Sequence, residues 1–122
     1  MEVQVFGTRK SADTRAALRF FSERRIKTHF VDLAERAASL GELRRFAQQF
    51  GAQALVDRES KRFAELGLRT AMLPDARWVD KLALEPLLLR QPLVRWQQRL
   101  TIGPAEETWT EWVRLTTEDR AR

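Results

Sequence analysis

Few side chains in this 122-residue sequence could perform chemistry, and Ser11 is the first of them. It stands between a strand-like run, "EVQVFG", and a helix-like run that begins "ADTRAALRFF". A serine hydroxyl attacks acyl or phosphoryl groups only when a base lies beside it. The single histidine, His29, lies at the start of the next strand-like run, and no spacing brings it to Ser11. We expect Ser11 to be the N-cap of the helix, with contact to an anion through its hydroxyl as the alternative.

Composition excludes several other kinds of site. The sequence contains no cysteine, so disulfides, thiolate metal sites and thiol chemistry within these residues are excluded. One histidine cannot form a multi-histidine metal site, and we expect neither a metal nor a cofactor. The acidic pairs Asp57/Glu59 and Glu106/Glu107 accompany no catalytic motif, and we interpret them as solvated charges. Without a run of 18 apolar residues or a signal-peptide pattern, the chain is expected to be cytoplasmic and to have no membrane partner.

Hydrophobic periodicity defines the elements that must position Ser11. Residues 2–7 and 28–33 alternate as strands do, with a helix from Ser11 to about residue 25 between them. This β-α-β unit favours a parallel strand pair. Further helices are predicted from Ser39 to Gly51, in one or two short pieces to Gly67, and near Pro74. Residues 93–96 and 99–102 flank "QQ" as a hairpin, and Pro104 is predicted at the first position of a last helix.

The order β-α-β, helices, β-β-α predicts an α/β fold with a mixed sheet of about four strands. Length and the absence of a linker predict a single domain over residues 1–115, with residues 116–122 as a frayed polar tail. In the last helix, Trp109 and Trp112 are expected in the core, on one stripe with Ala105 and Val113. Trp78 and Trp96 are less determined: core or semi-buried packing is favoured for Trp78, and a contact for a partner is the alternative.

Three sequence segments resemble the arsenate reductase/Spx family. They are "VFGTRKSADTRAAL", "LVDRESKRFAELGL" and "EPLLLRQPLV", the last followed by "LTIG", and the resemblance extends over about residues 3–115. It implies a thioredoxin-like fold with a helical insertion. It also places Ser11 at the position of the family's nucleophilic cysteine and Thr14 at the second cysteine of members with Cys-x-x-Cys. Arsenate reduction by a thiolate is therefore not expected from this chain.

The resemblance also locates the family's other functional positions. Arg58 corresponds to the family arginine of the middle segment. Gln91 and Gly103 stand where arsenate reductases have two further arginines, and Arg90 is of the kind found in the Spx branch. Pro92 matches the proline that is cis in this fold, so a cis Gln91–Pro92 bond is expected.

The net charge of +5 is concentrated in residues 1–30, which contain seven Lys or Arg residues and only three acidic ones. The simplest interpretation is a solvated arginine-rich surface, and an anionic partner is the alternative. The basic residues form no run and have no interleaved aromatic residues, so the pattern argues against nucleic acid, which only the net charge favours.

Two functions follow. The first is a non-catalytic protein-interaction or regulatory module without thiol redox activity, with Arg15, Arg19 and Arg90 as docking candidates. By resemblance to the Spx branch, its partner could be an RNA polymerase subunit. The alternative is a binder of small anions or glutathione at the start of the first helix, where N–H groups and the helix dipole favour negative charge. Its candidate residues are Lys10, Ser11, Arg58 and Arg90.

Overall fold

The computed structural model describes the backbone of residues 1–121 and the side chains of residues 1–117. The chain divides into two compact units, which are described separately. The first combines Met1–Phe30 with Gln91–Arg122, and the second is Val31–Arg90. That residues 1–115 form a single domain stays a prediction.

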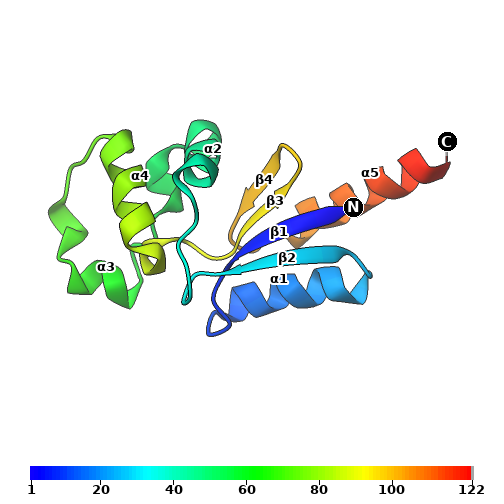
Figure 1. Ribbon diagram of the computed structural model, residues 1–122, viewed down its shortest axis with the longest axis horizontal. Coiled ribbons are helices and arrows are strands. Elements are labelled where there is room, and N and C mark those ends of the chain that lie inside the picture. The colour runs from blue at the N-terminus through cyan, green and yellow to red at the C-terminus, as the bar shows by residue number, and fades with distance from the viewer. Residues whose placement is uncertain (122) are drawn as a thin grey trace. The chain divides into compact units, whose positions relative to one another are not determined.

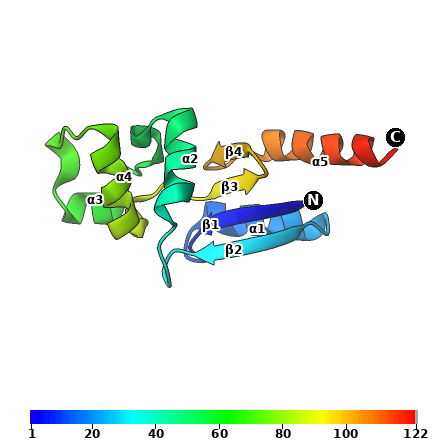
Figure 2. The same ribbon diagram turned by 45° about the horizontal axis from the view of Figure 1, so that its top comes forward.

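The sheet contains four strands in the order β2-β1-β3-β4. These are β1 (Glu2–Gly7), β2 (Lys27–Asp32), β3 (Leu93–Trp96) and β4 (Arg99–Ile102). Strand β3 pairs antiparallel with both β1 and β4, whereas β1 and β2 run in the same direction (Figure 2). The predicted mixed sheet and the predicted hairpin are therefore confirmed. At the hairpin turn, Gln97 adopts a positive φ of 56°.

Helices α1 (Ala12–Glu23) and α5 (Glu106–Ala121) share one hydrophobic core with the sheet. Alternate residues of the central strands, such as Val5 and Val94, face this core because side chains of a strand alternate between its two faces. Phe20 and Phe21 of α1 pack against Trp109 of α5, with ring centroids 5.5 and 5.3 Å apart. Burial of these large rings supplies much of the driving force that holds the helices to the sheet.

The structure corrects the predicted start and end of the last helix. Helix α5 begins at Glu106, so Pro104 precedes it by two residues and is not its first residue. Ala105 instead precedes the helix, and its carbonyl accepts the N–H of Trp109 at 3.0 Å. The expected tail is wrong for residues 116–121, because α5 continues to Ala121 (Figure 1). Arg122 lies outside the described residues.

All four tryptophans are buried. Trp109 and Trp112 lie in the core as predicted, and the Nε1–H of Trp109 donates to Thr101 Oγ1 at 2.8 Å. Trp96 packs against Trp112 with ring centroids 5.9 Å apart. Trp78 is only 1% exposed, so the favoured interpretation as a packed residue is confirmed and the alternative of a surface contact for a partner is wrong. Its neighbours Val79 and Leu82 are buried on the same helix, which places it in the core of the second unit.

The second unit consists of three α-helices and three short 3-10 helices. The α-helices are α2 (Leu40–Phe50), α3 (Lys61–Glu65) and α4 (Asp75–Leu84), and the 3-10 helices are η1 (Ala52–Leu55), η2 (Leu68–Thr70) and η3 (Pro86–Leu88). Ser39 is the N-cap of α2, where its hydroxyl accepts the N–H of Glu42 at 3.1 Å. Gly51 ends α2 with a positive φ of 82°. Both features were predicted, and together they fix the limits of this helix.

An ion pair joins two helical elements of this unit. Arg62 in α3 donates from Nε and Nη2 to the two carboxylate oxygens of Glu85, each at 2.8 Å. Hydrogen bonding by Arg62 lowers the pKa of the Glu85 carboxyl below its ordinary value. The two parallel hydrogen bonds fix the relative orientation of the side chains better than a single contact would.

Replacing Glu85 by glutamine should make the unit less stable in a pH-dependent way. Because the folded-state pKa of Glu85 is lowered, the ion pair contributes stability above the unfolded-state pKa of about 4.3 and loses it as pH falls through the folded-state value. The difference in free energy of unfolding between wild type and Glu85→Gln should therefore shrink below about pH 4.3 in urea titrations. Glu59→Gln, at an exposed site in the same unit, is the control. A difference that stays constant from neutral to acidic pH would contradict the expectation.

No helix in the described part of the chain is both long and apolar enough to cross a membrane. Among the same residues, no group of three or more acidic or histidine side chains gathers as a metal site would require.

Candidate functional site

The loop from Thr8 to Ser11 joins β1 to α1 and positions the helix start. The N–H of Ser11 donates to the carbonyl of Thr8 at 3.1 Å, which closes the turn. The Ser11 hydroxyl oxygen accepts the N–H of Thr14 at 3.1 Å, so Ser11 is the N-cap of α1 as predicted. Asp13 lies in the first turn of the helix, where its negative charge already complements the helix dipole.

Thr14, which the resemblance places at the second family cysteine, has a packing role. Its side chain is 0% exposed, and its hydroxyl donates to Oε1 of Gln91 at 3.2 Å. A Cβ added to Gly7 would lie 2.3 Å from Thr14 Oγ1, so only glycine lets β1 approach the helix this closely. The threonine and the glycine therefore fit each other.

Gln91 organises the loop, a role that its sequence position alone did not predict. Its Oε1 accepts three hydrogen bonds: from the Thr8 N–H at 2.7 Å, from the Thr8 hydroxyl at 3.1 Å and from the Thr14 hydroxyl at 3.2 Å. We call Thr8, Thr14 and Gln91 the glutamine clasp. An arginine at residue 91 would have no acceptor for these donors. The Gln91 amide oxygen therefore accepts hydrogen bonds that an arginine side chain could not accept.

Pro92 and Gly103 support the clasp. The Gln91–Pro92 peptide bond is cis, as predicted, and Pro92 is buried. The Pro92 carbonyl accepts the N–H of Gly103 at 2.9 Å. Gly103 adopts a φ of 72°, a left-handed conformation that favours glycine. The backbone conformation thus accounts for a glycine at residue 103, where the resemblance implies an arginine in arsenate reductases.

The basic residues around α1 belong mostly to the surface. Lys10, Arg15 and Arg19 are exposed. Arg15 also has a local role, because its Nη1 donates to the carbonyl of Arg9 at 2.7 Å. The Arg9 guanidinium in turn lies over the ring of Phe30, 4.9 Å from its centroid. These contacts hold part of the basic surface in a defined conformation.

The other two candidate arginines, Arg58 and Arg90, belong to the second unit, and both are exposed. The Arg58 guanidinium lies over the Phe63 ring, 5.6 Å from its centroid. The backbone N–H of Arg90 donates to the Leu55 carbonyl at 2.8 Å, which leaves its side chain at the surface. That these arginines join Lys10 and Ser11 around one anion stays a prediction.

The described residues place no base in contact with the Ser11 hydroxyl to activate it. Nε2 of His29 contacts Glu2 Oε1 at 3.2 Å, which engages the histidine with β1 and not with Ser11. The contact made by the Ser11 hydroxyl in the described residues is its cap bond to Thr14. A capping serine without an adjacent base remains protonated and unreactive. The arrangement therefore favours a structural role for Ser11.

Comparison with known proteins places the chain in a family. Residues 6–112 match the ArsC family, and the chain therefore belongs to that family. No curated protein matches the sequence. Its thioredoxin-like fold with a helical insertion confirms the fold class predicted from the sequence.

Solved structures share this fold at low sequence identity. An arsenate reductase from Vibrio cholerae is 24% identical with a TM-score of 0.74, over 84% of this chain and 90% of that one. The YffB protein is 18% identical with a TM-score of 0.81, over 89% and 96% of the two chains. An arsenate reductase related protein from Brucella melitensis is 17% identical with a TM-score of 0.66, over 93% and 95%.

The glutamine clasp should contribute measurably to stability. Gln91→Ala leaves the buried Thr14 hydroxyl and the Thr8 N–H without their acceptor, and should lower the free energy of unfolding by about 1–3 kcal/mol. Gln48→Ala, at an exposed position in α2, should change it by less than about 0.5 kcal/mol. Urea unfolding monitored by tryptophan fluorescence measures both.

A double-mutant cycle separates the hydrogen bond from general packing. Thr14→Val combined with Gln91→Ala should cost less than the sum of the two single changes, because either one alone breaks the same bond. Strict additivity of the two changes would show that the clasp is not an energetic unit.

Proposed function

We propose that this ArsC-family chain is a non-catalytic protein-interaction or regulatory module without thiol redox activity. The observation that carries the proposal is the structural role of the two residues that the resemblance places at the family's cysteine positions. Ser11 caps α1, and Thr14 is buried in the glutamine clasp. Because these two side chains stabilise the fold, we infer that the protein acts through its surface.

The proposed docking residues are basic. Arg15 and Arg19 lie exposed on α1, and Arg90 is exposed in the second unit. Arginine is favoured at interfaces because its planar guanidinium forms paired hydrogen bonds with carboxylates. We therefore propose an acidic protein partner, and an RNA polymerase subunit is the candidate that the Spx resemblance suggests. Localisation in the cytoplasm belongs to the same proposal.

The glutathione or anion alternative has less support from the site. The helix start and the exposed Lys10 favour an anion. However, the Thr8 N–H already donates to Gln91, and Asp13 places a negative charge in the first turn. Both features weaken the attraction for a further anion at this position.

Affinity capture with charge-reversed variants tests the docking proposal. The wild-type chain should retain a stoichiometric partner from lysate of the source organism, and that partner should bind again when purified. Arg15→Glu/Arg19→Glu and Arg90→Glu should each weaken the purified complex at least tenfold, because carboxylates would then face the partner's acidic groups.

The control is Arg44→Glu/Arg77→Glu, which reverses two exposed arginines on α2 and α4 and should leave binding unchanged. Circular dichroism checks that every variant is folded, which matters for Arg15 because it bonds the Arg9 carbonyl. Equal weakening by the control pair would show attraction by general charge and not docking.

An activity assay tests the non-catalytic part of the proposal. With arsenate and glutathione supplied, the wild-type chain should give no turnover above a protein-free blank, since it offers no thiolate to attack arsenic. Turnover that Ser11→Ala abolishes would overturn the proposal. Calorimetric titration with glutathione and with phosphate tests the alternative separately.

A further inference from the structure

The sheet has a polar region on the face opposite α1 and α5. Val3 and Val5 of β1 point into the core, so Glu2 and Gln4 lie on the other face. Arg95 lies on that face too, because it pairs directly with Gln4 in the β1–β3 register. Together with His29 and Gln97, these side chains line a cavity of about 420 Å³. A cavity of this volume suits a small ligand.

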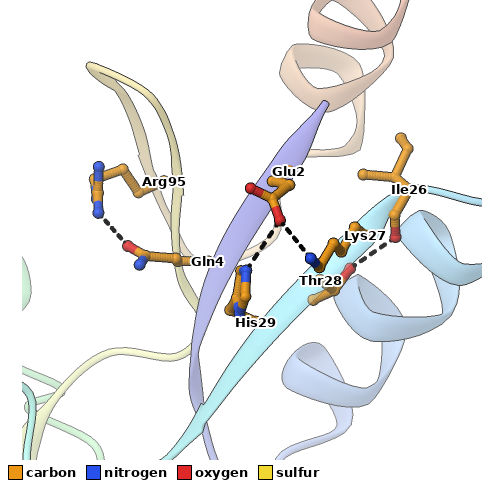
Figure 3. A network of polar contacts seen from close by, with 7 residues as sticks. All are labelled: Glu2, Gln4, Ile26, Lys27, Thr28, His29 and Arg95. Atoms are coloured by element: carbon orange, nitrogen blue, oxygen red, sulfur yellow. Dashed lines mark hydrogen bonds and ion pairs between the residues drawn. The ribbon is translucent and has the colours of Figure 1, made fainter.

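One side of this cavity is acidic. Oε1 of Glu2 takes both of its contacts, at 3.0 Å from Lys27 Nζ and at 3.2 Å from His29 Nε2. The second carboxylate oxygen accepts no hydrogen bond from the described residues and points away from both partners (Figure 3). A hydrogen bond from Lys27, and to a smaller extent one from His29, lowers the pKa of Glu2. Its carboxylate therefore stays charged at neutral pH.

The other side is basic and held in place. Nη1 of Arg95 donates to the Gln97 carbonyl at 3.1 Å, and Nη2 donates to Oε1 of Gln4 (Figure 3). Glu2 is two residues from Gln4 on the same strand face, which makes Arg95 its diagonal neighbour, with Cβ atoms somewhat less than about 7–8 Å apart. A carboxylate and a guanidinium therefore flank the same short stretch of β1.

We propose that this cavity binds a free α-amino acid. The ammonium group would donate to the open oxygen of Glu2, and the carboxylate would accept from Arg95, with the amides of Gln4 and Gln97 between them. A simple anion would leave the open oxygen of Glu2 without a donor, and a simple amine would not use the guanidinium of Arg95. A zwitterion of this size satisfies both groups at once. This site is separate from the glutamine clasp and does not depend on the docking proposal.

Nuclear magnetic resonance on the full chain tests the proposal. Each proteinogenic amino acid is added at millimolar concentration to ¹⁵N-labelled protein. At least one should shift the backbone amide signals of Gln4, His29, Arg95 and Gln97 in a saturable way. The carboxylic acid that lacks its amino group, and the amine that lacks its carboxylate, should each bind at least tenfold more weakly.

Two variants assign the contacts. Glu2→Gln and Arg95→Gln should each weaken binding about tenfold or more, while Glu107→Gln, in the first turn of α5, should not change it. Thermal unfolding checks that each variant is folded. The proposal is overturned if no amino acid shifts these signals, if the deaminated acid binds as tightly as the amino acid, or if both cavity variants keep wild-type affinity.

Discussion

The geometry of the first unit's loop depends on one oxygen atom, Oε1 of Gln91. It accepts hydrogen bonds from both donors of Thr8 and from the hydroxyl of Thr14, and so connects the end of β1, the first turn of α1 and the segment before β3. The segment with Gln91 is distant in sequence from the other two, and the closing bonds join residues 83 and 77 positions apart. Without this acceptor, the loop would have buried donors that water reaches poorly.

The same site shows how an ArsC-family scaffold can keep its fold while its catalytic positions change. The cap bond of Ser11 requires only a short side chain with an oxygen. Ser11 therefore starts the helix, although a serine without an adjacent base is a poor nucleophile. Gly103 stands in a left-handed conformation, and Gln91 supplies an acceptor that arginine lacks. Each replacement is locally favourable for the fold.

Local sequence signals predicted most of the architecture. Strand alternation predicted β1 and the β3–β4 hairpin, and Ser11, Ser39 and Gly51 predicted helix limits, because these effects act within a few residues. The clasp could not be predicted, since nothing in "RQPL" shows which donors meet Gln91 across the fold. Burial of Trp78 likewise depends on packing between elements, which a helix pattern alone leaves undetermined. The polar face beside Glu2 looked like ordinary strand alternation.

The left-handed backbone at Gly103 would oppose the evolution of an arginine at this residue. A single substitution could return a cysteine to position 11, at a helix start where a thiol is acidified. The two arginines that the resemblance implies at residues 91 and 103 would each destabilise this fold: one removes the acceptor for Thr8 and Thr14, and the other places a side chain where φ is 72°. Each intermediate along that path would be less stable and not yet more active. Selection for stability would therefore favour keeping Gln91 and Gly103.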